Sequence, residues 1–281
     1  MAENGGVVNS LVRAMLRIVR LIAVTYVCLV VFVYFYQRRM QYLPDTAAPP
    51  LPGAKRLGRL EEFSVTTEDG VQLFGWYWAG ERPVTLLIFH GNGGNREHRL
   101  YWLERLHHRL KTHLCIIDYR GYGGSGGSPT ERGLYLDAEA TLAWLETRGA
   151  PPAIYLGESL GTGVAVELAC RTPPLGLILQ SGFSSATDVA KYAYPFLPVD
   201  LLMKDRFENA PKMGDIECPI LVIHGERDGI IPMKLGQKLF DAAREPKDWL
   251  VVPGAGHNDL VVVASEEYDD RLNAFIERCV E

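Results

Sequence analysis

The sequence predicts an α/β fold built on an open, twisted and mostly parallel sheet with helices on both faces. Short runs of apolar and β-branched residues alternate along the chain with longer amphipathic stretches. Strands that alternate with helices form βαβ units, and these units place their strands parallel. The run VTLLIFH at residues 84–90 is apolar without interruption, as expected of a strand buried on both faces.

Each predicted strand or helix comes from one of these runs or stretches. The expected strands are residues 63–67, 71–78, 84–90, 114–119, 153–157, 175–181, 219–225 and 248–254. The expected helices are residues 97–111, 131–148, 160–171, 232–244 and 261–280. Asp69-Gly70 separates the first two strands, which predicts a leading antiparallel hairpin. Residues 181–214 are rich in aromatic residues and Leu, and they predict a small helical cap over the substrate pocket.

Composition excludes several classes of function. The chain has 281 residues, enough for one large α/β domain and a small addition. Its net charge is −5 and Lys and Arg form no long run, which disfavours a nucleic-acid partner. The five cysteines lack CxxC or Cys/His spacing, so we expect neither a zinc site nor another metal or cofactor. Nothing in the sequence indicates the oligomeric state.

The N-terminal segment 18–36 predicts a single-pass transmembrane anchor. Residues 21–36 carry no charge, and about 19 residues approach the length that crosses a bilayer. Tyr34 and Tyr36 lie where an interfacial aromatic belt would, followed by two arginines. A cleaved signal peptide is disfavoured because no small-x-small site follows the apolar run. A core helix is disfavoured because the run has no polar face.

The anchor divides the chain into four predicted parts. Residues 1–17 form an N-terminal tail, 18–36 the anchor, 37–59 a tether, and 60–281 the α/β domain with the cap. The tether is rich in Pro and Ala and lacks apolar periodicity. An extended linker and an ordered strap lying on the domain are both open interpretations of it.

The sequence GESLG at residues 157–161 predicts a nucleophile elbow with Ser159 at its apex. It follows a strand and precedes a helix, where a G-x-S-x-G turn exposes its serine. The glycines remove Cβ atoms that would collide in so tight a turn. The helix that follows directs its N-terminal amides toward an oxyanion formed there. A serine that only caps the helix is the simpler alternative.

A serine nucleophile requires a base and an acid that orients the base. Asp228 follows the strand 219–225 at its carboxyl edge, where catalytic groups of open α/β sheets gather. Glu226 is a competing acid two residues away. His257 is the candidate base because it lies on a glycine-containing loop after the last predicted strand. The order serine, acid, histidine is that of hydrolases with this elbow.

Two backbone amides are candidates for the oxyanion hole. One is the amide of Leu160, directly after the nucleophile, and the other is that of Asn92 in the turn HGNGGN after residues 84–90. The Asn92 side chain is available to hold its own loop. A glycine-rich turn without a catalytic role is the alternative for this segment.

The ordered motifs HGNGGN, DYRGYGGSGGSP, GESLGTGVA, HGERD and PGAGHND resemble the α/β-hydrolase superfamily. The segment QRRMQYLPD after the anchor extends the similarity to the membrane-anchored serine hydrolases related to the yeast Bem protein family. The resemblance implies Ser159, Asp228 and His257 as the triad, with the amides of Asn92 and Leu160 as the oxyanion hole. It also implies a catalytic domain on the non-cytoplasmic side, which the balanced arginines around the anchor leave undecided.

The sequence therefore predicts a membrane-anchored acyl hydrolase that cleaves an ester or thioester through an acyl-enzyme. A nearby membrane favours lipid esters, acyl thioesters or lipidated proteins as substrates. A serine peptidase or amidase on the same triad is the alternative, because the fold does not choose between them. A non-catalytic, membrane-tethered interaction protein is the remote alternative.

Overall fold

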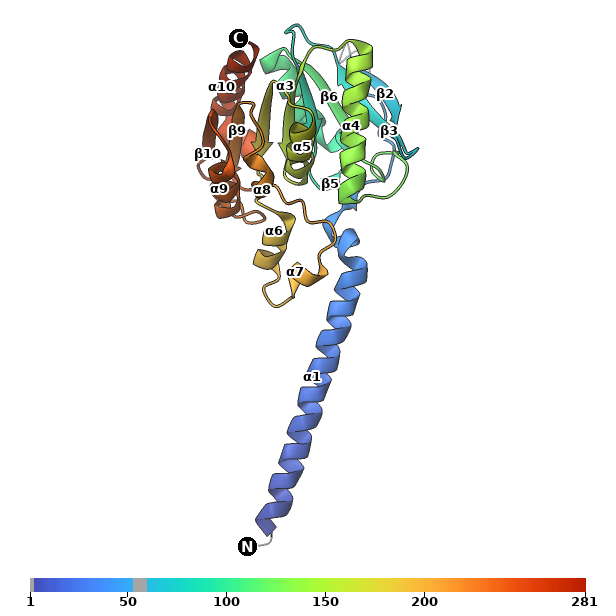
Figure 1. Cartoon of the computed structure of the whole chain (residues 1–281), viewed down its shortest axis with the longest axis vertical. Helices are drawn as coiled ribbons and strands as arrows, with labels where there is room; N and C mark the ends of the chain where they lie inside the picture. Colours follow the sequence, from blue (N-terminus) through green and yellow to red (C-terminus); the bar gives the residue numbers. More distant parts are fainter. Residues whose placement is uncertain (1–2, 53–59) are drawn as a thin grey trace.

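The computed structural model describes residues 3–52 and 60–281. Its centre is an eight-stranded sheet in the order β10-β9-β8-β7-β4-β6-β3-β2 (Figure 1). The strands are β2 (Leu60–Thr66), β3 (Gln72–Trp78), β4 (Thr85–Phe89), β6 (His113–Asp118), β7 (Ala153–Glu158), β8 (Gly176–Gln180), β9 (Ile220–Gly225) and β10 (Lys247–Val252). β3 is antiparallel to both β2 and β6. The other strands, which are β6, β4, β7, β8, β9 and β10 in sheet order, run parallel. The predicted fold class and its leading hairpin are confirmed.

Helices cover both faces of this sheet and form a separate apolar cluster on each. One face carries η1 (Arg96–Arg99), α3 (Leu100–Leu110) and α10 (Leu260–Val280), and the other carries α4 (Glu131–Arg148), α5 (Leu160–Arg171) and α9 (Met233–Ala242). Trp102 of α3 and Phe275 of α10 belong to the first cluster. Leu134 of α4, Val164 of α5 and Leu239 of α9 belong to the second. The central strands are buried from both sides, which explains their uninterrupted apolar sequences.

The predicted cap is short and helical. It contains α6 (Ala186–Ala193), α7 (Val199–Leu202) and α8 (Ala210–Met213). Ser185 begins α6 by accepting a hydrogen bond from the Asp188 amide at 3.0 Å. Figure 1 places α6 and α7 at the end of the domain from which α1 extends, beside the upper part of that helix. The cap thus lies at the end of the domain that faces this helix.

The N-terminal helix is longer than the predicted anchor. α1 runs without interruption over Glu3–Gln41, so neither expected boundary, 17/18 or 36/37, coincides with a structural break. Both flanks consist of residues compatible with a helix, and no proline stops the helix before Pro44. Within the described residues, the part of α1 from Asn9 to Gln41 is the one helix with the length and hydropathy to cross a membrane.

Part of the predicted tether is an ordered strap on the domain. β1 (Leu43–Pro44) pairs in parallel with β5 (Gly93–Gly94). Asp45 and Thr46 then accept hydrogen bonds from the amides of Gly123 and Gly124 at 2.8 and 3.1 Å. For these residues the structure favours the strap over the extended linker. The end of the predicted tether, residues 53–59, lies outside the described residues.

Candidate active site

Ser159 lies at a sharp turn between β7 and α5, with φ of 51° and ψ of −115°. A positive φ is costly for a residue with a Cβ atom, and such strain is held by the surrounding structure. The flanking glycines make the turn possible. A Cβ atom on Gly161 would lie 1.9 Å from the carbonyl oxygen of Phe89, and one on Gly157 would lie 2.6 Å from the Gly161 oxygen. The steric reason inferred for these glycines therefore holds in the structure.

The structure brings together the three residues expected to form the triad. His257 Nε2 lies 3.0 Å from Ser159 Oγ, and His257 Nδ1 lies 2.7 Å from Asp228 Oδ2. Asp228 follows β9 and His257 follows β10, so adjacent parallel strands deliver both side chains to one edge of the sheet. Glu226, the competing acid, instead accepts a hydrogen bond from the Gly254 amide at 2.9 Å. The carboxylate that faces His257 is that of Asp228.

The surroundings of Asp228 keep its carboxylate ionised and oriented. Its Oδ1 accepts hydrogen bonds from the amides of Ile230 and Ile231 at 2.9 and 2.8 Å. Burial acts to raise the pKa of Asp228, but the hydrogen bond from His257 and the Ile231 amide outweigh it, and the pKa lies below its ordinary value. The neighbouring His224 is buried, which lowers its pKa, and its Nε2 lies 2.9 Å from the Ile231 carbonyl oxygen. His224 is therefore a packed residue.

The two residues expected to supply oxyanion amides flank Ser159. Leu160 begins α5, where the first amides of a helix have no intrahelical acceptor. Asn92 lies in the loop after β4, and its carbonyl oxygen accepts from the Leu43 amide at 3.0 Å and the Tyr122 hydroxyl at 2.9 Å. The Asn92 side chain donates to the Gln41 carbonyl at 3.0 Å and thereby ties the loop to the end of α1.

A carboxylate within the elbow supports this loop, and sequence reasoning missed it. Glu158 Oε2 accepts hydrogen bonds from the Gly91 amide at 3.0 Å and from Arg99 Nε at 3.1 Å, and Arg99 also donates to the Gly93 carbonyl. Burial acts to raise the pKa of Glu158, but Arg99 and the Gly91 amide outweigh it and lower the pKa. Glu158 occupies the variable position of the elbow motif, so no local pattern distinguishes it.

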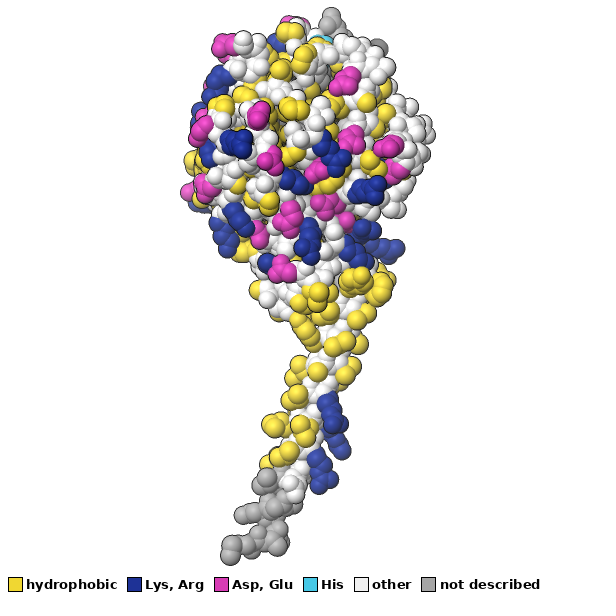
Figure 2. Space-filling model, viewed as in Figure 1, with side chains coloured by type: hydrophobic (Ala, Val, Ile, Leu, Met, Phe, Trp, Pro, Cys, Tyr) yellow, Lys and Arg dark blue, Asp and Glu magenta, His cyan; other side chains and the backbone are white. Residues whose placement is uncertain are grey.

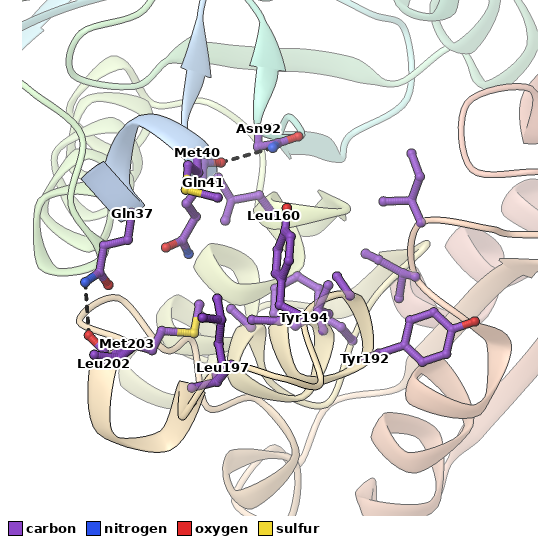
Figure 3. A pocket seen from close by; sticks show the side chains of 18 of the residues that line it. Gln37, Met40, Gln41, Asn92, Leu160, Tyr192, Tyr194, Leu197, Leu202 and Met203 are labelled. Carbon is purple, nitrogen blue, oxygen red and sulfur yellow. Dashed lines mark hydrogen bonds between the residues drawn. The ribbon is translucent and has the colours of Figure 1, made fainter. Parts of the chain in front are cut away.

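An apolar pocket of about 450 Å³ opens beside Ser159. Figure 3 shows side chains from α1, from the loop after β4 and from the cap around it. Its lining includes Val33, Gln37 and Met40 of α1, Tyr194, Leu197 and Leu202 of the cap, and Asn92, Ser159 and Leu160 of the candidate site. Tyr192 and Tyr194 of the cap line the pocket and are also partly exposed to the outside.

Residues 118–121, the start of the motif DYRGYGGSGGSP, make structural contacts. Asp118 accepts a hydrogen bond from the Arg96 amide at 2.7 Å, and Tyr119 donates to the His90 carbonyl at 2.9 Å. The Arg120 guanidinium binds Asp137 and Asp69 at 2.8 Å each. These contacts hold the loops around the site without facing Ser159.

Comparisons with known proteins place the chain in a family. Residues 84–211 match the sequence model of a family described as alpha/beta hydrolase fold. The uncharacterized protein Rv2307c of Mycobacterium tuberculosis is 38% identical over 270 residues, which cover 93% of this chain and 94% of that protein. The chain belongs to the α/β-hydrolase superfamily.

Other relatives of this α/β-hydrolase carry names that describe an activity. Lysophosphatidylserine lipase ABHD12 of Danio rerio is 38% identical over 196 residues, which cover 61% of this chain. The chain spans about half the length of the ABHD12 relatives that it matches. Among solved structures, the Pyrococcus furiosus esterase Pf2001 superposes with a TM-score of 0.70 at 21% identity, covering 84% of this chain and 98% of the esterase. At this identity the likeness concerns the fold.

Proposed function

We propose that this α/β-hydrolase is a membrane-anchored serine hydrolase that cleaves acyl esters or thioesters. Ser159 is the nucleophile, His257 the general base and Asp228 the group that orients His257. The observation that carries the proposal is the continuous hydrogen-bonded series from Ser159 through His257 to Asp228, with Ser159 in the lining of an apolar pocket. The motifs that resemble the Bem-related branch support the same assignment.

The geometry supports a two-step acyl transfer. Ser159 Oγ attacks the carbonyl carbon of the substrate while His257 Nε2 takes the hydroxyl proton. The amides of Asn92 and Leu160 donate to the oxyanion of the tetrahedral intermediate. His257 then gives its proton to the leaving alcohol or thiol, and the acyl group stays on Ser159. Water, deprotonated by His257, attacks this acyl-enzyme, releases the carboxylic acid and restores the hydroxyl of Ser159.

The pocket favours substrates with an apolar acyl chain. Its wall is formed largely by aliphatic and aromatic side chains from the cap and α1, and such a wall stabilises hydrocarbon by burial. The lipase activity in the name of the ABHD12 relatives supports a lipid substrate. A peptide substrate would require polar groups along this wall, and the lining offers few of them.

The anchor completes the proposal. The uncharged run of α1 lies in the bilayer, and within the described residues α1 is the one candidate span. The catalytic domain faces the non-cytoplasmic side, as the resemblance implies. A glycosylation reporter fused to the C-terminus tests this orientation, because only a non-cytoplasmic C-terminus is modified.

Labelling by a fluorophosphonate probe tests the nucleophile. The probe is expected to label the wild-type chain and to leave Ser159→Ala unlabelled, because the probe reacts only with an activated serine. Ser64→Ala is the matched control, since Ser64 is exposed on β2 and far from the triad in sequence. Equal labelling of the wild type and Ser159→Ala would contradict the assignment. Comparing aryl esters of increasing acyl length with acyl thioesters and aminoacyl anilides then separates esterase from amidase activity.

A further inference from the structure

The cap packs along one stripe of α1. Val30, Val33, Gln37 and Gln41 are half-buried while their neighbours on the helix are exposed, and their spacing of three or four residues defines one face. Gln37 donates to the Leu202 carbonyl at 2.9 Å and accepts from the Lys204 amide at 2.8 Å. The cap is therefore bound to α1 by side chains of this helix.

The same contact extends far down the helix. The Tyr26 hydroxyl donates to the Phe196 carbonyl at 2.8 Å. Tyr26 precedes Gln37 by eleven positions, which is about 16 Å along a helix axis. It lies inside the uncharged run 21–36, the part of α1 that a bilayer would surround. Any position of the bilayer that covers this run also places Phe196 at the depth of the hydrocarbon.

The outer surface of the cap is apolar, as a surface at the depth of the hydrocarbon must be. Leu201 is 83% exposed and Phe196 is 59% exposed, and Tyr194, whose ring centre lies 6.5 Å from that of Phe196, is also exposed. Figure 2 shows apolar side chains along α1 and around the end of the domain that meets it, with Lys and Arg side chains beyond them. Such a patch on the surface of a protein marks an interaction site.

The charged groups of the cap have local partners. Lys191 pairs with Asp200 at 2.6 Å. The ammonium group of Lys204 lies 4.1 Å from the centre of the Tyr34 ring. Long cationic side chains such as those of Lys191 and Lys204 reach the lipid headgroups while their aliphatic stems stay in apolar surroundings.

The pocket connects this surface to Ser159. Its wall is formed on one side by Val33 and Met40 of α1 and on the other by Leu197 and Leu202 of the cap, as Figure 3 shows for the last three. A hydrocarbon chain lying between α1 and the cap would therefore have bilayer at one end and the nucleophile at the other.

We propose that the cap tip, residues 192–203, inserts into the same leaflet as the C-terminal half of α1, and that the pocket is an acyl site opening sideways into the bilayer. A lipid acyl chain then reaches Ser159 from the hydrocarbon without crossing water. The occupant of the exposed apolar surface is the bilayer, because the surface is continuous with the apolar length of α1. The inference rests on the proposed acyl-hydrolase function and adds the route by which its substrate arrives.

Paired substrates test this route in the full chain reconstituted in phosphatidylcholine vesicles. Leu201 is exposed and does not line the pocket, so Leu201→Glu leaves the site intact and places a charge at hydrocarbon depth. We expect turnover of a long-chain monoacyl lipid embedded in the vesicles to fall about tenfold or more, a loss of at least ~1.4 kcal/mol. Hydrolysis of water-soluble p-nitrophenyl butyrate is expected to stay within about twofold of the wild type. Val280→Glu, at the far end of the molecule, is the matched control and should change neither rate.

The outcomes separate this inference from the proposed function. Ser159→Ala is expected to lose hydrolysis of p-nitrophenyl butyrate, and this result tests the proposed function alone. If that result holds and Leu201→Glu hydrolyses the embedded lipid at the wild-type rate, the lateral route is wrong. An equal loss on both substrates also contradicts it, because the charge would then act on the site and not on access.

A depth measurement provides an independent readout. An environment-sensitive dye is attached at a Leu201→Cys position in a chain whose exposed Cys28 and Cys170 are replaced by serine. Lipids with nitroxide on the acyl chain are expected to quench this dye and not one attached at Val280→Cys. Quenching by aqueous iodide alone would overturn the inference. Protection that depends on protein concentration and not on lipid would identify a second copy of the chain as the occupant.

Discussion

Asp228 Oδ2 lies 2.7 Å from His257 Nδ1, and the other oxygen of the same carboxylate is held by two backbone amides. The amides fix the plane of the carboxylate, and the carboxylate fixes the ring of His257. Nε2 of this ring is thereby directed at Ser159 Oγ. The orientation of the proposed base thus depends on the turn that follows β9.

Replacing Asp228 by asparagine should lower the catalytic rate without lowering the stability of the fold. The amide oxygen of Asp228→Asn still accepts from Ile230 and Ile231, so the thermal unfolding temperature should change little. The amide group no longer stabilises the tautomer and the protonated state of His257, and kcat on aryl esters should fall by about 10³ to 10⁴. Glu226→Gln is the control and should retain activity within about twofold. A large loss in Glu226→Gln with an active Asp228→Asn would reverse the assignment of the acid.

A methyl group at Gly161 should destabilise the elbow. In Gly161→Ala the added Cβ atom would meet the Phe89 carbonyl oxygen at 1.9 Å, and both Gly161 of α5 and Phe89 of β4 are buried. Overpacking of this kind costs roughly 1–3 kcal/mol, which lowers the unfolding temperature by several degrees. Gly214→Ala is the matched control, because its φ is −68° and no atom lies within 4 Å of an added Cβ. Calorimetry on both variants checks the difference.

Glu158→Gln should change how the free energy of unfolding depends on pH. Because the pKa of Glu158 is depressed in the folded chain, its charge stabilises the fold above its unfolded pKa of about 4.3. This stabilisation is lost as pH falls through the folded pKa. The wild type should therefore be more stable than Glu158→Gln at neutral pH, and the difference should shrink as pH falls through and below about 4. Urea unfolding across this range measures it, and a difference that does not vary with pH would contradict the prediction.

The same variant should lower activity moderately. Glu158 holds the Gly91 amide directly and the Gly93 carbonyl through Arg99, and Asn92 lies between these two residues. A weaker hold on the loop should reduce kcat by about tenfold, the equivalent of ~1.4 kcal/mol in transition-state stabilisation, with KM nearly unchanged. A rise in KM alone would show that Glu158 acts on substrate binding.

Arg38→Ala should loosen the cap from α1. Arg38 forms a two-point ion pair with Asp205, at 2.7 and 3.1 Å, and the Asp205 carboxylate is almost fully buried. Because Arg38 is half exposed, the loss should cost on the order of 1 kcal/mol. Since α1 and the cap share the pocket wall, KM for long-chain esters should rise more than KM for acetate esters. Arg39→Ala, which removes a neighbouring arginine stacked on Tyr36, is the matched control and should leave both values unchanged.

The elements that could be predicted are those that a pattern within a short stretch of sequence indicates. Apolar runs and helical periodicity located the strands and helices of the sheet, because burial on one or both faces dictates residue type position by position. Glycine spacing located the turn at Ser159, because the clash of a Cβ atom on Gly157 with the Gly161 carbonyl acts within five residues. Asp228 and His257 could be predicted from strand order, since parallel strands end at one edge. Their catalytic roles stay predictions for the experiments above.

What could not be predicted depends on contacts between distant segments. The support of the loop by Glu158 and Arg99 joins residues 59 positions apart, and no spacing indicates it. The extent of α1 also escaped prediction, because its charged flanks continue the helix that the hydropathy pattern confines to 18–36.

The sequence by itself determined a hydrolase-like sheet, a strained turn at Ser159 and an apolar segment at the N-terminus. Each follows from local sterics or from the free energy of burying a short run of residues. Only the tertiary structure decided that α1 forms a wall of the pocket beside Ser159, through Gln37 and Tyr26 bonded to the cap 165 and 170 positions later. These hydrogen bonds join surfaces that become neighbours only after the domain has folded, and no pattern along the chain indicates them.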